Sequence, residues 1–464
     1  MVEKCGLDLS RPVLLGFSGG PDSLCLLYLL LESGVETIAV HVDHGLRNSS
    51  ADEAAYVVEL CRNLHIPCIS RRMDVTGYAS QNNLSVEESA RVLRYDFLFE
   101  EAARNNAQAV LVGHHADDQV ETILMHLLRG SGLSGLAGMR PVLVPNPWSK
   151  SIPLVRPLLY VDREGINQYI KEHELEPVID ESNTDIHYFR NRIRQELVLN
   201  LATYNPQIKN RLLHMAEVVS VEDDYMVQQL EEAWVRVLLQ ARKHYLVLDR
   251  EKATSLHPAI LKRLIRKSIY WMDSNLRDVD FNVIERGFQF CVNPNRSNRV
   301  DLMAGIEMFT YLKRNIVIAY RHDPLHELWP QLQSDKKVDL LVPGETRVSD
   351  NWKLTTSIRD MYEQVNDPCI GQLDAEKGAG HLVLSRFRPG DRFSPYGFSG
   401  NSIKLGDYWT NQGLPTRARR NWPLIQAGDE IVWIPGFRIA DDVQVDAHTK
   451  EIVRIELVKT EPVA

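Results

Sequence analysis

The chain has 464 residues, a length that corresponds to about two to four domains. Hydrophobic residues make up 44% and charged residues 25% of it, as in a soluble globular protein with a full core. We find no run of about 18 apolar residues and no signal-peptide pattern, so we expect neither a membrane span nor secretion. The net charge of −9 does not indicate nucleic-acid binding by the chain as a whole, so basic patches have to be sought locally.

The cysteines are scattered, and none belongs to a C-x-x-C pair. The spacing therefore favours neither a zinc site nor an iron–sulfur site. Scattered thiols are typical of a reducing compartment, so we expect a cytoplasmic protein. The six are Cys5, Cys25, Cys61, Cys68, Cys291 and Cys369.

The first predicted strand, residues 13–17, leads directly into the sequence S-G-G-P-D-S at residues 18–23. A second apolar run, residues 24–31, stops before Gly34 as a helix would. A strand, a glycine-containing turn and a helix N-terminus form an anion site, because backbone N–H groups can approach a phosphate and the helix dipole favours its charge. Ser18 and Ser23 add hydroxyl donors.

Two other interpretations of this loop are a Walker loop and a tight turn without a ligand. No lysine follows the glycines, so the Walker pattern is absent. The full string resembles the PP-loop of the ATP pyrophosphatases, which hold the pyrophosphate of ATP and transfer AMP to an oxygen. This resemblance implies ATP binding by Ser18, Gly19, Gly20, Pro21, Asp22 and Ser23.

The first part of the chain alternates between strand and helix patterns, which predicts an α/β fold with a doubly wound parallel sheet. Polar clusters follow three of the strands, at residues 18–23, 43–47 and 114–118. Ligands bind beyond the carboxyl ends of such strands, so the clusters should converge on one pocket. The further strands are expected at residues 37–42, 68–75 and 109–113, and the helices at residues 54–64, 86–105 and 120–129.

The third cluster carries carboxylates at helical spacing. In a helix that starts at Ala116, Asp117 and Asp118 would share a face with Glu121. Carboxylates above a phosphate site repel one another without a cation, and Mg²⁺ would resolve this. The alternative is a solvated helix face stabilised by the helix dipole. We expect the opposite face to pack on the sheet through Val120, Ile123, Leu124 and Leu127.

Longer blocks resemble the tRNA-isoleucine lysidine synthetase family. They are H-V-D-H-G-L-R at residues 41–47, L-V-G-H-H-A-D-D-Q-V-E-T at residues 111–122, and E-E-S-A-R with R-Y at residues 87–95. Residues 180–185 and 190–194 are similar to a further block, D-E-S-N-T-D with R-N-R-I-R. The resemblance covers most of the first 215 residues.

The resemblance implies that ATP adenylates the C2 oxygen of the wobble cytidine in a CAU-anticodon isoleucine tRNA, and that free lysine then displaces AMP. ATP, Mg²⁺, lysine and this tRNA are the implied ligands, and a homodimer is left open. Two alternatives are a PP-loop tRNA thiolase and a non-catalytic tRNA-binding protein. The implied catalytic residues are Asp117, Asp118, Glu121, His114 and Arg91, and the ATP site would also include Asp43 and His44. The candidate metal ligands are Asp22, Asp117 and Asp118. The residues of this part that would contact tRNA are Arg190, Arg192 and Arg194.

In the middle of the chain the alternation of strand and helix patterns ends. A long helical stretch is expected to run from Asn205 to Arg242, and a second helix to begin at His257. That second helix carries a basic cluster, for which a solvated face is the alternative to a tRNA contact. Residues 298–321 have a strand pattern, and residues 325–337 are the predicted linker. The cluster consists of Lys262, Arg263, Arg266 and Lys267.

The last part, residues 340–464, is predicted to be a small α+β, β-rich domain. Residues 386–420 contain seven basic and two acidic residues, interleaved with aromatic side chains that suit either base stacking or a small core. This stretch resembles the family's C-terminal domain, which binds the acceptor stem of the tRNA. Where the family usually has a lysine-rich run, this sequence has one lysine, Lys404. The expected tRNA contacts are Arg386, Arg388, Arg392, Lys404, Arg417 and Arg420. The predicted domains are residues 1–215 (PP-loop, catalytic), 216–335 (mostly helical with a linker helix, tRNA-contacting) and 340–464 (tRNA-binding).

Overall fold

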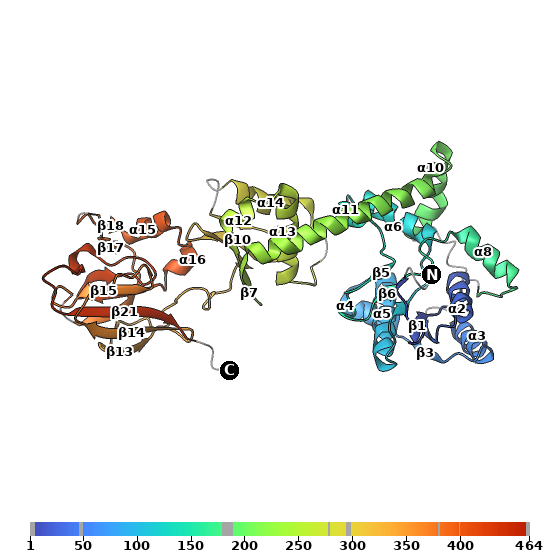
Figure 1. The fold of residues 1–464 in the computed structure, drawn as a ribbon, viewed down its shortest axis with the longest axis horizontal. Helices are drawn as coiled ribbons and strands as arrows, with labels where there is room; N and C mark the ends of the chain where they lie inside the picture. Colours follow the sequence, from blue (N-terminus) through green and yellow to red (C-terminus); the bar gives the residue numbers. More distant parts are fainter. Residues whose placement is uncertain are drawn as a thin grey trace. The chain divides into compact units, whose positions relative to one another are not determined.

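The computed structural model describes residues 5–45, 50–178, 189–276, 279–293, 298–378, 381–398 and 400–460 (Figure 1). These form two compact units, Met1–Met226 and Val227–Ala464. The boundary lies within a long helix, α11 (Ile208–Val237). Within the described ranges, no helix is both long and apolar enough to cross a membrane. The division into three domains stays a prediction.

The first unit is built on a six-stranded sheet with the order β3-β2-β1-β4-β6-β5. All neighbouring strands run parallel except β5, which is antiparallel to β6. The doubly wound parallel sheet expected from the sequence is therefore confirmed. Its strands are β1 (Val13–Gly16), β2 (Thr37–Asp43), β3 (Cys68–Arg72), β4 (Val110–Leu111), β5 (Val142–Leu143) and β6 (Leu154–Val155).

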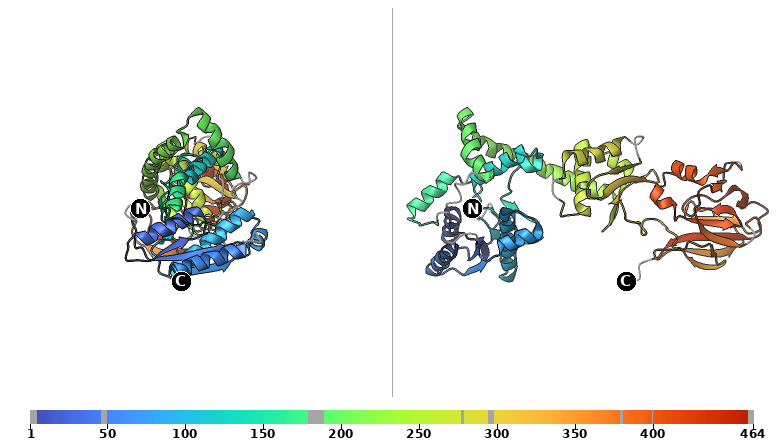
Figure 2. Two further views of the ribbon diagram at one scale, coloured as in Figure 1. Left: turned by 90° about the vertical axis from the view of Figure 1, so that its right-hand side faces the viewer. Right: turned by 180° about the vertical axis from the view of Figure 1, so that it is seen from behind.

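Helices cover both faces of this sheet, as the two views of Figure 2 and the view of Figure 1 show. Leu15 packs with residues of α2 (Pro21–Glu32), α3 (Ser50–Asn63) and α8 (Arg163–Glu172). The adjacent Leu14 packs with α5 (Val86–Arg104). Neighbouring strand residues point to opposite faces, and both leucines are fully buried. The apolar run of β1 therefore packs against helices on both faces of the sheet.

Two element boundaries differ from the sequence-based expectation. Helix α2 begins at Pro21 rather than Leu24, because proline is well suited to the first turn of a helix, and this puts Asp22 and Ser23 in that turn. Strand β3 ends at Arg72 rather than residue 75. Its continuation is α4 (Val75–Asn82), which starts there because the Asp74 side chain accepts a hydrogen bond from Gly77 N.

Helix α6 (Ala116–Leu128) packs differently from the expectation. Val120 and Leu124 form a cluster with Ile193 and Val198 rather than lying on the sheet. Leu127 is 52% exposed, so its predicted burial was wrong. The covering segment comprises α9 (Phe189–Arg192), a π-helical turn (Ile193–Leu197) and α10 (Val198–Tyr204); a short helix, α7 (Leu133–Leu136), follows α6.

In the second unit, α11 gives way to strand β7 (Leu238–Arg242), so the predicted extension of the helix to Arg242 was wrong. Residues 238–242 pair instead with β8 (Tyr245–Asp249) in a hairpin. A five-stranded antiparallel sheet follows, in the order β7-β8-β11-β10-β9. Its remaining strands are β9 (Arg299–Asp301), β10 (Ile306–Tyr311) and β11 (Asn315–Tyr320), and its helices are α12 (Arg250–Thr254), α13 (Pro258–Met272) and α14 (Phe281–Val292).

The remainder of this unit is β-rich, as predicted. Two four-stranded sheets have the orders β12-β16-β19-β20 and β13-β14-β21-β15. The segment predicted as a linker is packed rather than exposed, since Leu325 and Trp329 are almost fully buried in the main core of the unit. The elements are β12 (Val338–Asp339), β13 (Gly344–Arg347), β14 (Trp352–Arg359), β15 (Ile370–Asp374), β16 (Leu382–Arg386), β17 (Arg392–Phe393), β18 (Ile403–Lys404), α15 (Leu405–Gln412), α16 (Thr416–Arg419), β19 (Pro423–Ala427), β20 (Glu430–Trp433) and β21 (Ile452–Lys459).

Two leucines of α6 provide a matched test of this packing. Leu124 is 3% exposed and Leu127 is 52% exposed. Leu124→Ala should lower the free energy of unfolding by about 2–5 kcal/mol, because it leaves a cavity. Leu127→Ala should change it by less than about 0.5 kcal/mol. Urea unfolding followed by circular dichroism measures both, and equal losses would contradict the packing of α6 on residues 193–198.

Candidate active site

The loop of residues 18–23 connects β1 to α2 and is held by its own serines. Ser23 Oγ donates to Gly20 O at 3.1 Å and lies 3.1 Å from Ser18 Oγ. The N-cap of α2, Gly20, makes no side-chain capping bond, so the first amides of the helix are free of a side-chain cap. Uncapped N–H groups at a helix N-terminus are suited to bind an anion.

Two glycines allow the backbone to approach closely here. Gly19 has φ +81°, and a Cβ at this position would lie 2.9 Å from Val57 Cγ2. At the end of β4, a Cβ on Gly113 would lie 3.1 Å from the backbone of Asp22 and Ser23. A side chain at residue 113 would press against the backbone of the first turn of α2, so the glycine allows the end of β4 and this turn to lie close together.

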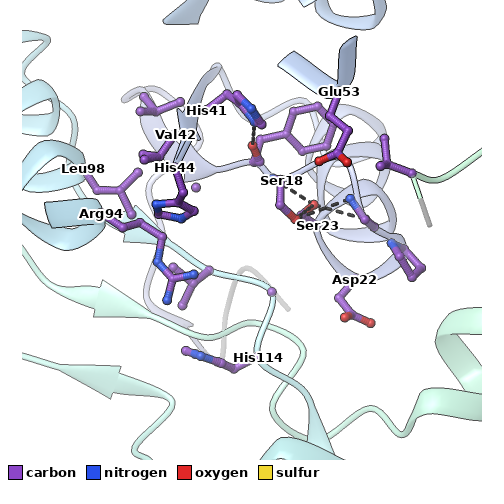
Figure 3. A pocket seen from close by; sticks show the side chains of 18 of the residues that line it. Ser18, Asp22, Ser23, His41, Val42, His44, Glu53, Arg94, Leu98 and His114 are labelled. Atoms are coloured by element: carbon purple, nitrogen blue, oxygen red, sulfur yellow. Dashed lines mark hydrogen bonds between the residues drawn. The ribbon is translucent and has the colours of Figure 1, made fainter. Parts of the chain in front are cut away.

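A cavity of about 460 Å³ lies at the carboxyl ends of β1, β2 and β4. Figure 3 shows Ser18, Ser23 and Asp22 on one side of it and His44, Arg94 and His114 on the other. The three polar clusters that follow the strands therefore share one pocket, as the sequence predicted. The predicted residues that line it are Ser18, Gly20, Pro21, Asp22, Ser23, Asp43, His44, His114, Asp118 and Arg194.

The carboxylates at the start of α6 are neutralised by arginines from a segment about 70 residues later. Glu121 is 1% exposed, and its two oxygens accept from Arg190 Nε at 2.7 Å and Arg194 Nε at 2.5 Å. Asp118 accepts from Arg190 Nη2 at 3.2 Å and from the backbone N of His115 at 3.0 Å. Burial favours a raised pKa for Asp118, but His115 and Arg190 hold it below the usual range.

The other two acidic residues also have cationic partners. Asp22 forms an ion pair with Arg163, the first residue of α8. Asp117 forms an ion pair with Lys209 and accepts from Arg163 N at 2.9 Å. Burial would raise the pKa of Asp117, but the Lys209 ammonium and the Arg163 amide lower it. Asp117 and Glu121 support the wall of the cavity and do not line it.

Three polar atoms in the cavity wall are buried without a partner among the described residues. They are Nδ1 of His44, Nε of Arg94 and the hydroxyl of Tyr95. Burial and then the positive charge of Arg94 lower the pKa of His44 to about 4, so its imidazole is neutral near pH 7. Buried polar groups are normally hydrogen-bonded, so these atoms mark a surface shaped for a polar ligand.

His114 has a defined role in the hydrogen-bond pattern. Arg156 Nε donates to His114 Nδ1 at 3.3 Å. Burial lowers the pKa of His114 to about 3, so the ring is neutral and, with Nδ1 as the acceptor, carries its proton on Nε2. His114 therefore offers the cavity wall a hydrogen-bond donor rather than a base.

Some predicted residues lie elsewhere. Arg91 is exposed, with its guanidinium carbon 5.1 Å from the centre of the Tyr95 ring, and it does not line the cavity. Arg192 is also exposed and pairs with Glu196 at 3.4 Å. Residues 46–47 and 180–185, which belong to the blocks quoted above, lie outside the described residues. The sequence reading did not assign a role to Arg94, Arg156, Arg163 or Lys209, and only Arg94 lay in a recognisable block.

Comparison with known proteins decides the family. Residues 3–201 match the family described as PP-loop domain, and residues 383–457 match the family described as TilS substrate C-terminal domain. A curated tRNA(Ile)-lysidine synthase from Dehalococcoides mccartyi (strain CBDB1) is 31% identical over 465 residues, covering 98% of this chain and 97% of that protein. The chain belongs to the tRNA(Ile)-lysidine synthase family. This confirms the resemblance seen in the sequence blocks.

Other similar proteins carry the same name. The tRNA(Ile)-lysidine synthase of Geobacter sulfurreducens (strain ATCC 51573 / DSM 12127 / PCA) is 30% identical, with 96% of this chain and 93% of that protein covered. A solved structure titled "Crystal structure of TILS C-terminal domain" is 18% identical and covers 27% of this chain and 99% of its own, with a TM-score of 0.25. That score is too low to support an argument.

The basic residues that resemble the synthase family's C-terminal domain fall into two groups. Arg417 forms an ion pair with the buried Glu307 at 2.5 Å and donates to Tyr320 O, and Arg386 donates to Leu332 O. The side chains of these two arginines are thus bound within the unit. The exposed group comprises Arg388, Arg392, Lys404 and Arg420.

The aromatic residues of the same stretch are mostly core, which was the alternative to base stacking. Phe393, Tyr408, Trp409 and Trp422 are at most 2% exposed. Phe387 is half-buried and lies edge-on to Trp409. The two exposed aromatics of the stretch are Tyr396 and Phe398.

The lowered pKa of His44 predicts a pH dependence of stability. Unfolded histidine has a pKa of about 6.5, so between pH 6.5 and about 4 the unfolded chain binds the additional proton. The free energy of unfolding should therefore fall as the pH is lowered through this window. His44→Gln should reduce the fall measured by urea unfolding at pH 7 and pH 5, whereas His214→Gln on the exposed surface of α11 should leave it unchanged. A His44→Gln profile parallel to that of the parent would contradict a buried neutral imidazole.

Proposed function

We propose that this protein ligates free lysine to C2 of the wobble cytidine in an isoleucine tRNA with a CAU anticodon, using ATP. The supporting observation is the cavity itself, in which the 18–23 loop, the buried polar edge of His44 and Arg94, and Asp118 meet at the ends of three strands. Family membership supplies the identity of the reaction. The protein is accordingly a tRNA-modifying ligase that forms AMP and pyrophosphate.

The reaction has two steps. The C2 oxygen of cytidine attacks the α-phosphorus of ATP, and pyrophosphate leaves. The amino group of lysine, neutral so that its lone pair is free, then attacks C2; the C2–O bond breaks, AMP leaves and the nitrogen loses a proton. Both leaving groups are anionic, so preorganised donors such as the α2 amides and the Ser18 hydroxyl lower the barrier by stabilising charge that develops on phosphate oxygens.

The donor set suits Mg²⁺, which prefers oxygen ligands and is usually held by one or two carboxylates together with substrate phosphates. Asp22 and Asp118 line the cavity and supply such oxygens. No group of three or more His, Cys, Asp or Glu residues in the described ranges forms a complete metal cage. We therefore assign Asp22 and Asp118 as the residues that would hold Mg²⁺ bound to ATP, where the ion would neutralise phosphate charge. Asp117 is less suited, because it does not line the cavity.

The thiolase alternative requires a reactive thiol or a cluster. Cys25, in α2 beside the loop, is buried, and burial raises its pKa to about 11, which keeps it protonated and unreactive. The deciding experiment incubates the protein with ATP, Mg²⁺, labelled lysine and CAU-anticodon tRNA. Label on the tRNA together with release of AMP supports the ligase, and unlabelled tRNA with active ATP binding contradicts it.

Two serines provide a test of the 18–23 loop: Ser23, in the first turn of α2, and Ser33, the C-cap of the same helix. Ser23→Ala removes the hydroxyl that bridges Ser18 and Gly20. The rate of lysine transfer should fall by about 100-fold, because the Ser18 hydroxyl and the loop amides that stabilise the transition state are no longer held in position. Ser33→Ala removes a hydroxyl whose one hydrogen bond within the described residues is to Leu29 O, and it should retain the parental rate. Transfer of labelled lysine at saturating ATP measures both, and equal rates would rule out a catalytic loop.

The exposed basic residues of the C-terminal part are proposed to bind tRNA phosphates. The double variant Arg388→Ala/Lys404→Ala should weaken tRNA binding and make the salt dependence of log K shallower by about two units, one for each lost phosphate contact. ATP binding in the absence of tRNA should be retained. Fluorescence anisotropy across a salt series checks this, and an unchanged slope would show that the two side chains are only solvated.

A further inference from the structure

The solvent-facing side of α13 has an unusual composition. Between residues 262 and 271 its buried positions are Leu264, Ile265, Ser268 and Ile269. Every other position in this interval is basic or aromatic, and none is acidic. We call these positions the α13 face: Lys262, Arg263, Arg266, Lys267, Tyr270 and Trp271.

Further aromatic rings adjoin this face. Trp271 is 51% exposed, and its ring centre lies 5.8 Å from that of Trp234. Lys267 Nζ lies 4.7 Å from the centre of the Trp234 ring. At the other end, Lys262 Nζ lies 5.7 Å from the ring of Phe281, which is 71% exposed at the start of α14. The exposed rings of Phe281 and Trp271 thus lie at the two ends of the row of cations.

Acidic residues compensate only part of the positive charge. Glu285 pairs with Lys262 at 2.7 Å, and Glu231 pairs with Lys267 at 2.5 Å. Arg266 is exposed and has no acidic partner within the described part of the chain. Arg266 thus carries a positive charge that these two acidic residues do not neutralise, in a chain whose net charge is −9.

We propose that the α13 face binds RNA, with Arg266 on a backbone phosphate and Trp271 stacked on an unpaired base. Lys and Arg side chains bind backbone phosphates, and exposed aromatic rings stack on single-stranded bases without sequence preference. That the RNA is the tRNA substrate rests on the proposed function. The Leu and Ile residues of α13 are all buried within the unit, so the helix has no free apolar face of the kind that an interfacial helix buries in a membrane.

The test uses the full chain and fluorescently labelled CAU-anticodon tRNA across a salt series. Arg266→Ala should weaken binding and make the salt dependence of log K shallower by about one unit. The matched control is Lys243→Ala, which removes one exposed charge from the β7–β8 turn and should leave the slope unchanged. Equal slopes for the two variants would overturn the phosphate contact.

Trp271→Ala should weaken tRNA binding by about tenfold with little change in salt slope, because a stacking contact is lost rather than a charge. Parental affinity in this variant would overturn the base contact. Binding to anionic lipid vesicles is measured with the same variants. If the Arg266 and Trp271 substitutions weaken vesicle binding but leave tRNA binding unchanged, the assignment to RNA is overturned. Lysine transfer is measured separately, so a chain that binds tRNA through this face without transferring lysine would contradict the proposed function and not this inference.

Discussion

The candidate site depends on the neutralisation of a buried carboxylate. Glu121 lies at the start of α6 with almost no exposure, and a buried carboxylate without partners would be strongly unfavourable. Arg190 and Arg194 each place one guanidinium N–H on a separate oxygen of it. Removing one partner of such an arrangement leaves an uncompensated buried charge, which is strongly destabilising. The same arginines reach Asp118, so the cavity wall and the segment covering α6 are fixed together.

The sheet topology explains why the loop, the second strand and the acidic helix meet. Strand β1 lies between β2 and β4, so the chain segments that leave these three strands emerge side by side at one edge. Ligands of open α/β sheets bind at the carboxyl ends of the strands, where the strand order reverses. Gly113 then lets β4 end against the first turn of α2, which brings polar groups from distant parts of the sequence to one cavity.

Much of this arrangement could be predicted because its determinants are local. The apolar run of β1 and the glycines of residues 18–23 are recognisable in the sequence. The polar clusters with Asp43 and His114 could be placed at the carboxyl ends of strands of the same sheet. The partners of the acids could not be predicted. Arg163 and Lys209 are ordinary surface residues in sequence, and only the fold brings them to Asp22 and Asp117. Periodicity likewise placed Leu127 on the apolar face, but burial depended on residues 193–198 reaching only as far as Leu124.

The spacing of these ion pairs has a consequence for synthesis on the ribosome. Asp117 is separated from Lys209 by 92 residues, and Glu121 from Arg190 by 69. At about 5–20 residues per second, Asp117 is made roughly 5–20 s before its lysine. In the first part of that interval, the nascent first unit carries the acidic end of α6 before Arg190, Arg194 or Lys209 has been made. The ion pair between Asp117 and Lys209, which supports the cavity wall, can therefore form only after the first residues of α11 have been made.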